Sequence, residues 1–198
     1  MGAEYRVILA DCPWPYEWAH GNGAAAHHYP TMPIADLCAL PIADLAADPA
    51  LLFMWATWPL LPEAMQVMAA WGFTYKTLAF IWIKRNPTNI GLFMGTGQYT
   101  RSNSEPCLLG VRGHGHTLRQ DAGVLQVMEA EELGDLIEAP RRAHSRKPDD
   151  QYTRIDRLVG DVPRVELFAR RKRENWASWG HGVTGPQTLA DFAAGATA

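Results

Sequence analysis

The sequence has few cysteines and no long apolar segment. Its 198 residues include three cysteines, Cys12, Cys38 and Cys107, which are odd in number and widely spaced. This set excludes a disulfide framework and fits a reducing compartment, so we expect a cytoplasmic protein. No apolar run approaches the ~18 residues that span a bilayer. The first residues lead directly into a strand-like run, which leaves no room for a signal peptide, and we expect no membrane partner.

The chain also has little net charge, and its charged residues are unevenly distributed. Charged residues make up 20% of the chain and the net charge is -3, which gives no overall sign of nucleic-acid binding. Two short segments, 141–147 and 170–173, nevertheless carry four Lys or Arg side chains each. Basic clusters of this kind are typical of phosphate contacts, although a charge run taken alone is more often a solvated surface.

Strand-like and helix-like segments alternate along the chain. Hydrophobic residues make up 47% of the sequence, which excludes a disordered protein. Apolar runs predict strands at 5–10, 51–56, 74–84, 107–111, 136–139 and 164–170. Helical spacing predicts short helices within 34–45 and longer ones at 60–71 and 148–158. This order indicates an α/β protein with a doubly wound, mostly parallel sheet. We expect one domain over residues 1–185 and a flexible tail over 186–198.

The residues that follow the first predicted strand can bind an amino group through hydrogen bonds. In a doubly wound sheet, ligands bind at the carboxyl ends of the strands, where Asp11, Cys12, Pro13 and Trp14 lie. The Asp11 carboxylate and the Cys12 carbonyl can both accept hydrogen bonds from an exocyclic amino group, and Trp14 can stack on the base that carries it. The same four residues also suit a strand-ending turn with a core tryptophan, so the motif alone leaves both interpretations open.

Seven segments in the same order resemble one family. Asp11-Cys-Pro-Trp14 resembles the Asp-Pro-Pro-Trp motif of the MT-A70 family of adenine N6-methyltransferases. The other six segments that resemble this family are 28–32, 52–57, 82–86, 100–109, 144–149 and 166–180. The resemblance covers about residues 5 to 183. It implies a single Rossmann-like, S-adenosylmethionine-dependent methyltransferase domain of the permuted type, in which the catalytic motif precedes the cofactor motifs.

The resemblance also implies roles for individual residues. Asp11 and the Cys12 carbonyl would orient the amino group, Pro13 would shape the turn, and Trp14 would stack on the base. The implied cofactor-binding residues are Asp11, Lys147, Glu166, Phe168, Arg170 and His181, with Lys147 facing the methionine carboxylate. The implied substrate-binding residues are Tyr29, Lys84, Asn86, Asn103, Glu105, Arg141 and Arg142. Methyl transfer from a sulfonium needs positioning and electrostatics, so we expect no metal.

Two positions depart from the family pattern. Cys12 replaces the first proline of the motif, which keeps the carbonyl but makes the turn less rigid. His181 stands where the family has an asparagine.

The expected function is methyl transfer from S-adenosylmethionine to the N6 amino group of adenine in DNA. The alternatives are the same reaction on RNA, or a catalytically silent nucleic-acid-binding subunit of a methyltransferase complex. A homo- or heterodimer is also expected.

Overall fold

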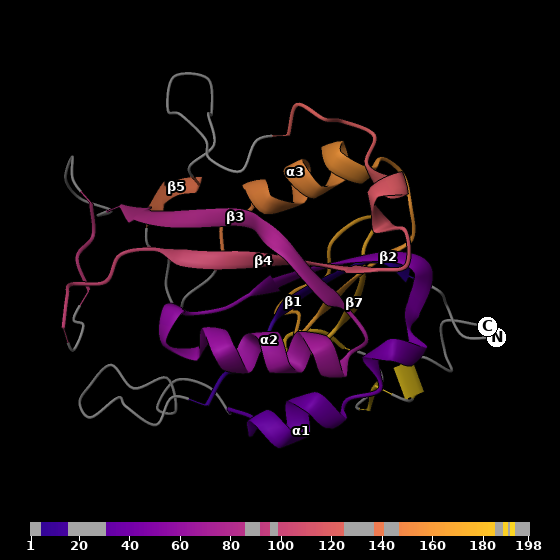
Figure 1. Ribbon diagram of the computed structural model, residues 1–198, viewed down its shortest axis with the longest axis horizontal. Helices are drawn as coiled ribbons and strands as arrows, with labels where there is room; N and C mark the ends of the chain where they lie inside the picture. Colours follow the sequence, from indigo (N-terminus) through magenta and orange to yellow (C-terminus); the bar gives the residue numbers. More distant parts are fainter. Residues whose placement is uncertain are drawn as a thin grey trace.

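The computed structural model describes residues 5–15, 31–85, 92–95, 99–124, 137–140, 147–184, 188–189 and 191–192 (Figure 1). Within these ranges the strands form one 7-stranded sheet in the order β5-β3-β4-β2-β1-β6-β7. The strands are β1 (Tyr5–Asp11), β2 (Ala46–Trp55), β3 (Thr74–Arg85), β4 (Glu105–Arg112), β5 (Ile137–Pro140), β6 (Arg164–Leu167) and β7 (Ala177–Trp179). Only the pairs that β4 makes with β2 and β3 are antiparallel among these strands, which confirms a mostly parallel sheet.

Helices cover both faces of the sheet. The helices α1 (Ile34–Ala39) and α2 (Leu61–Ala70) pack on one face, and α3 (Asp150–Val159) packs on the other (Figure 1). Short 3-10 turns lie at η2 (Ile42–Asp44), η3 (Trp58–Leu60) and η4 (Gly115–Leu118). The doubly wound α/β architecture predicted from the sequence is confirmed.

The sheet separates two hydrophobic cores. Ile8 of β1 belongs to the core under α1 and α2, whereas Leu9 belongs to the core under α3. Successive side chains of a strand point to opposite faces, so a central strand covered on both sides must be apolar throughout. This explains why β1 and the second half of β2 appear in the sequence as continuous apolar runs.

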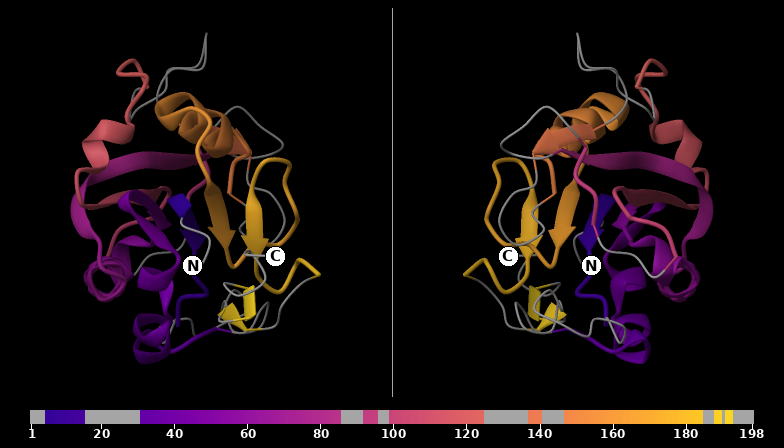
Figure 2. Two further views of the ribbon diagram at one scale, coloured as in Figure 1. Left: turned by 90° about the vertical axis from the view of Figure 1, so that its right-hand side faces the viewer. Right: turned by 90° about the vertical axis from the view of Figure 1, so that its left-hand side faces the viewer.

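Several element boundaries differ from the prediction, and one strand was missed. β4 begins at Glu105 rather than at residue 107, and β6 ends at Leu167 rather than at residue 170, because Phe168 takes a positive φ that ends the extended chain. β2 begins at Ala46 rather than at residue 51, because Ala46 pairs with Tyr5 ahead of a register shift in β1. α3 begins at Asp150 rather than at Pro148. β7 was not predicted, because three residues give no periodic signal; it lies beside β6 at the edge of the sheet (Figure 2).

The described part of the predicted tail packs against the domain. Leu189 is buried in the core under α1 and α2, and the Phe192 ring stacks on Tyr5 with the ring centroids 6.3 Å apart. Apolar burial of this kind holds a terminal segment against a domain, and the flexibility predicted for 186–198 stays a prediction. Among the described residues, no helix is both long and apolar enough to cross a membrane.

Candidate active site

The predicted catalytic motif is a turn at the carboxyl ends of β1 and β2. Asp11, the last residue of β1, lies opposite Trp55 at the end of β2. The Pro13 carbonyl accepts a hydrogen bond from the Met32 backbone N–H at 2.9 Å, and the Cys12 carbonyl accepts one from the Trp14 N–H at 2.9 Å. A carbonyl oxygen has two lone pairs, so Cys12 can still accept a second hydrogen bond.

Trp14 is part of the hydrophobic core. It is 4% exposed, and its indole Nε1–H donates to the Trp55 carbonyl at 3.0 Å. The structure therefore gives Trp14 the position of a core tryptophan, which was the second interpretation of the motif. Stacking of Trp14 on a base would require the ring to leave this position, because a ring that is 4% exposed offers no free face.

A chain of four alternating charges runs along one side of the site. The Lys147 Nζ lies 2.9 Å and 3.0 Å from the two carboxylate oxygens of Asp11, and 3.1 Å from Glu105 Oε2. Lys84 forms an ion pair with the other oxygen of Glu105. We call these residues, Asp11, Lys147, Glu105 and Lys84, the paired wall. It joins residues that are 136 positions apart in the sequence.

The charges of the paired wall stabilise one another. Burial alone would lower the pKa of Lys147, but Asp11 and Glu105 raise it above its ordinary value. Burial would likewise raise the pKa of Glu105, but the two lysines hold that pKa below its ordinary value. Lys147 therefore stays an ammonium and Glu105 a carboxylate at neutral pH. The Trp55 ring adds a cation–π contact, with Lys147 Nζ 5.6 Å from its centroid.

Asn103 fastens the segment before β4 to the end of β3. Its Oδ1 accepts a hydrogen bond from the Lys84 backbone N–H at 3.0 Å, and its Nδ2 donates to the Lys84 carbonyl at 2.8 Å and to the Phe93 carbonyl. These contacts use both amide hydrogens and one lone pair of Oδ1. The structure thus gives Asn103 an anchoring contact with the backbone, and its contact with a substrate stays a prediction.

The opposite side of the site carries the residues expected to bind the cofactor. A pocket of about 310 Å³ lies at the ends of β1 and β6, which is within the usual size of small-molecule sites. The residues that line it are Leu9, Asp11, Trp55, Lys147, Asp149, Gln151, Tyr152, Glu166, Phe168, Arg170 and Arg171. Five of the six predicted cofactor residues therefore meet in one cavity. We call the side formed by Glu166, Tyr152 and Phe168 the open wall.

Glu166 on the open wall is incompletely paired. Its Oε2 is buried and has no hydrogen-bond partner among the described residues. Burial raises the pKa of Glu166, and hydrogen bonding with Tyr152 and the charge of Arg173 only partly offset that rise. Burial and the Glu166 carboxylate together raise the pKa of Tyr152. A buried acceptor without a donor costs free energy, and a ligand that brings a hydroxyl or amino group recovers it.

The backbone after β6 is held in an unusual conformation. Phe168 has a φ of 59°, the left-handed region that costs energy for a side chain of this size. The turn after β7 packs against it, with the Gly182 N–H bonded to the Ala169 carbonyl at 3.1 Å. A Cβ at Gly180 would lie 2.3 Å from the Ala169 nitrogen, so only glycine permits this contact. The turn after β7 therefore fixes the shape of the open wall.

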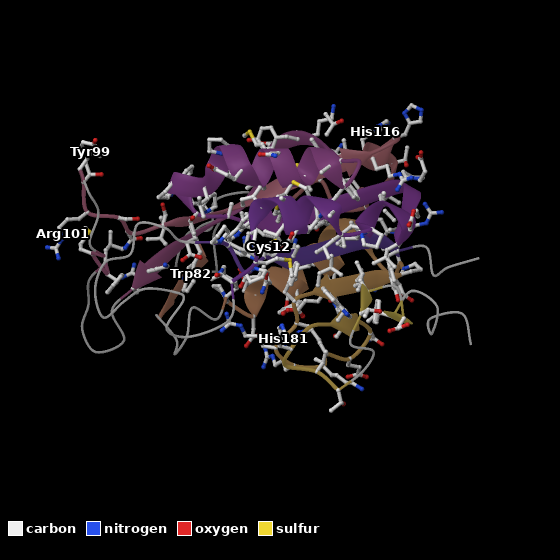
Figure 3. The ribbon with its side chains drawn as sticks, turned by 90° about the horizontal axis from the view of Figure 1, so that it is seen from below. Cys12, Trp82, Tyr99, Arg101, His116 and His181 are labelled. Atoms are coloured by element: carbon white, nitrogen blue, oxygen red, sulfur yellow. The ribbon has the colours of Figure 1, made fainter. Side chains whose placement is uncertain are left out.

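The remaining predicted residues divide into two groups. His181 is exposed and is not among the residues that line the pocket; Cys12 lies inside the molecule and His181 at its surface (Figure 3). Its role in cofactor binding stays a prediction. Tyr29, Asn86, Arg141 and Arg142 lie outside the described residues, so their predicted contacts also stay predictions.

The sequence analysis did not select several residues that line the site. Trp55 could have been found by the same rule that selected Asp11, because it ends the neighbouring parallel strand. Its Nε1–H donates to Gln151 Oε1 at 2.6 Å, which ties β2 to the first turn of α3. Gln151 and Tyr152 had no signal beyond their position just after the motif that contains Lys147.

The thiol of Cys12 is not poised for chemistry. Burial, and next the neighbouring Asp11 carboxylate, raise the pKa of Cys12 well above its ordinary value. The thiol is therefore protonated at neutral pH and is a poor nucleophile. In the part of the chain that the structure describes, no group of three or more His, Cys, Asp or Glu side chains could hold a metal ion.

Comparison with known proteins agrees with this arrangement. The sequence profile of the MT-A70 family matches residues 5–182. This chain belongs to the MT-A70 family. It is 31% identical over 197 residues to the Type II methyltransferase M.MunI of Mycoplasma sp, an alignment that covers 89% of this chain and 77% of the relative. It is 28% identical to the human N(6)-adenosine-methyltransferase catalytic subunit METTL3, over 96% of this chain and 31% of that protein.

The N(6)-adenosine-methyltransferases that resemble this chain are much longer than it. An N(6)-adenosine-methyltransferase MT-A70-like protein of Arabidopsis thaliana is 27% identical, and the match covers 24% of its length. The chain thus spans a third or less of the N(6)-adenosine-methyltransferases that it matches. Membership of the family identifies the chain as an adenine N6-methyltransferase and implies S-adenosylmethionine as the methyl donor.

Proposed function

We propose that this chain transfers a methyl group from S-adenosylmethionine to the N6 amino group of adenine in DNA, in the pocket between the paired wall and the open wall. The observation that carries the proposal is the meeting of Asp11 with Lys147 and Glu166 in one cavity at the carboxyl ends of β1 and β6. Such a cavity holds both an acceptor for an amino group and groups suited to a zwitterionic nucleoside. A silent binding subunit has no need of this combination.

The residues of the pocket fit the chemistry of S-adenosylmethionine. The free Oε2 of Glu166 would accept a hydrogen bond from a hydroxyl of the ribose. The Lys147 ammonium would bind the methionine carboxylate, sharing its protons between that anion and the carboxylates of the paired wall. Phe168 and Arg170 line the same cavity and would contact the rest of the nucleoside. When bound, the cofactor supplies a methyl group already activated by its sulfonium.

Asp11 would orient the adenine amino group. Its carboxylate has about four lone-pair sites, and Lys147 contacts both oxygens without filling all of these sites. The carboxylate oxygens that Lys147 leaves open would act as acceptors for the amino group. Hydrogen bonds from N6 to Asp11 and to the Cys12 carbonyl would turn the nitrogen lone pair toward the methyl group, which is catalysis by position and electrostatics.

DNA is favoured over RNA by the coverage of the relatives. The chain spans 77% of a Type II methyltransferase, a class that modifies DNA, but only 31% of METTL3. In duplex DNA the target adenine must leave the base stack to reach Asp11. Arg170, Arg171 and Lys172 are exposed, and the first two line the pocket, so this segment would contact phosphates.

Methyl transfer to matched substrates tests the proposal. Wild type and Asp11→Ala are each incubated with labelled S-adenosylmethionine and a nucleic acid. The nucleic acids are single- and double-stranded DNA and RNA that share the same adenine-containing sequences. We expect N6-methyladenine in DNA with the wild type and none with Asp11→Ala. Label in RNA alone would establish the RNA enzyme instead. No label in any nucleic acid, together with no cofactor binding by calorimetry, would support the silent subunit.

A further inference from the structure

An exposed tryptophan lies next to the catalytic turn. Trp58 begins η3, three residues after Trp55, whose backbone pairs with Asp11. Three residues of extended chain span at most about 10 Å, so Trp58 remains close to the carboxyl end of β1. Its exposed fraction is 40%, which contrasts with the 4% of Trp14.

The Trp58 indole is held in place. Its Nε1–H donates to the Ser104 hydroxyl at 3.0 Å. Ser104 immediately precedes Glu105, which binds Lys147 in the paired wall. At the other end of η3, Leu60 is buried in the core under α1 and α2 and anchors the turn. Because the N–H already has a partner, the exposed part of the ring offers an aromatic surface in a fixed orientation.

A nucleic-acid methyltransferase needs such a surface. An extruded adenine leaves its neighbours partly unstacked, and aromatic side chains that stack on bases recover part of that cost. Trp14 was expected to stack on a base, but its ring is buried and hydrogen-bonded in the core. Tyr99 is 99% exposed but lies at the far end of the loop before β4, with Trp82 between it and Cys12 (Figure 3).

We propose that Trp58 stacks on a nucleobase of the target strand, adjacent to the adenine that enters the site. The inference rests on the proposed function, since it assumes that the strand crosses the carboxyl edge of the sheet at Asp11. Trp58 would bind the substrate directly, and Ser104 would position the Trp58 ring.

Equilibrium binding tests this role without depending on methyl transfer. A short fluorescein-labelled single-stranded DNA with one adenine is titrated with wild type, Trp58→Ala, Trp58→Phe and Tyr75→Ala, and anisotropy is recorded. Tyr75 is the matched control, because it is 39% exposed but lies at the start of β3. This position is at the opposite end of the strands from Asp11. We expect about 10-fold weaker binding for Trp58→Ala, which is within the range of one base–aromatic stack. Trp58→Phe should recover most of the loss, and Tyr75→Ala should bind like wild type.

An abasic substrate identifies the contact as stacking. When the base on either side of the adenine is replaced in turn by an abasic site, one of the two replacements should weaken wild type and leave Trp58→Ala nearly unchanged. An equal loss for Trp58→Ala on every substrate would overturn the proposal and indicate a general effect on the fold. Binding of Trp58→Ala at wild-type strength, or no DNA binding by wild type, would overturn it as well.

If the chain is not a DNA methyltransferase, the experiments give a result that differs from the failure of Trp58 stacking. In that case wild type would bind the oligonucleotide but transfer no methyl group to it. The binding difference between wild type and Trp58→Ala would still be measurable. On active enzyme, Trp58→Ala should raise the KM for DNA more than it lowers kcat, and the affinity for S-adenosylmethionine should not change.

Discussion

The paired wall and the open wall hold the buried carboxylates of Glu105 and Glu166 in opposite electrostatic states, and Glu105 lies behind Lys147 rather than in the pocket itself. On the paired wall, two lysines neutralise Glu105 and hold its pKa below the ordinary value. On the open wall, burial raises the pKa of Glu166, and one of its oxygens has no partner within the described structure. The paired wall is thus complete without a ligand, whereas the open wall is completed by one. This difference assigns Asp11 of the paired wall to orientation of the reacting amino group and Glu166 of the open wall to binding of the cofactor ribose, with Lys147 serving the cofactor carboxylate between them.

The largest effect should come from Asp11. Asp11→Asn keeps the shape of the side chain but replaces one acceptor oxygen with a donor, so the amino group of adenine loses part of its alignment. We expect kcat to fall by about 10³-fold, the size seen when one electrostatic contact of a transition state is removed. Single-turnover methyl transfer measures it. The matched control is Asp36→Asn, an exposed carboxylate on α1, which should retain wild-type activity.

Lys147 should matter most for stability. Lys147→Met leaves the carboxylates of Asp11 and Glu105 without their shared cation, and Lys147 and Glu105 are both buried, with side chains 8% and 10% exposed. We expect the free energy of unfolding in urea to fall by about 3 kcal/mol, as for other broken buried ion pairs. The double variant Lys147→Met/Glu105→Gln should recover part of that loss, and the exposed Lys76→Met should cost little. A stable Lys147→Met protein would show that the paired wall is not a coupled unit.

Glu166 should show the opposite balance of stability and function. Glu166→Gln removes a buried, incompletely paired charge, so stability at neutral pH should stay equal or rise, while affinity for S-adenosylmethionine falls about 10-fold. Calorimetric titration measures the affinity. Glu63→Gln is the control, because Glu63 on α2 also has a buried oxygen without a partner among the described residues but lies outside the pocket.

The two walls should also respond to pH in opposite directions. The pKa of Glu166 is raised above 4.5 by folding, so the folded state binds a proton more tightly than the unfolded state. The free energy of unfolding therefore falls as the pH rises from 4.5 through the pKa of Glu166 in the folded state. The pKa of Glu105 is lowered below 4.5, so its contribution is lost as pH falls below that value. Urea unfolding of Glu166→Gln should lose the first dependence and that of Glu105→Gln the second. The same pH profile in both variants would contradict the assignment.

The smallest effect should come from the Cys12 thiol. Because burial keeps this thiol protonated, Cys12→Ala should change kcat by less than about 3-fold and cost about 1 kcal/mol of stability through lost packing. Methyl transfer and urea unfolding measure the two quantities. A 100-fold loss of kcat in a folded Cys12→Ala protein would show that the side chain, and not the backbone carbonyl, takes part in the reaction.

The sequence predicted the parts of this site that depend on local patterns. The apolar run of β1 and the polar residue that ends it located Asp11, and the resemblance located Lys147 and Glu166. Sequence alone could not show that Lys147 lies between Asp11 and Glu105, because that depends on β4 running antiparallel beside β2. It also could not decide whether Trp14 faces a base or the core, since both uses favour the same residue. β7 is too short to give a periodic pattern, yet its turn fixes the open wall.

The most direct test asks whether Asp11 and Glu166 have separate roles. Cofactor affinity and the rate of single-turnover methyl transfer are measured in parallel for wild type, Asp11→Asn and Glu166→Gln. We predict that Asp11→Asn loses far more in transfer rate than in affinity. We predict the reverse for Glu166→Gln, which should regain a near wild-type rate at saturating S-adenosylmethionine. Equal losses of affinity and rate in both variants would contradict the separation of the paired wall from the open wall.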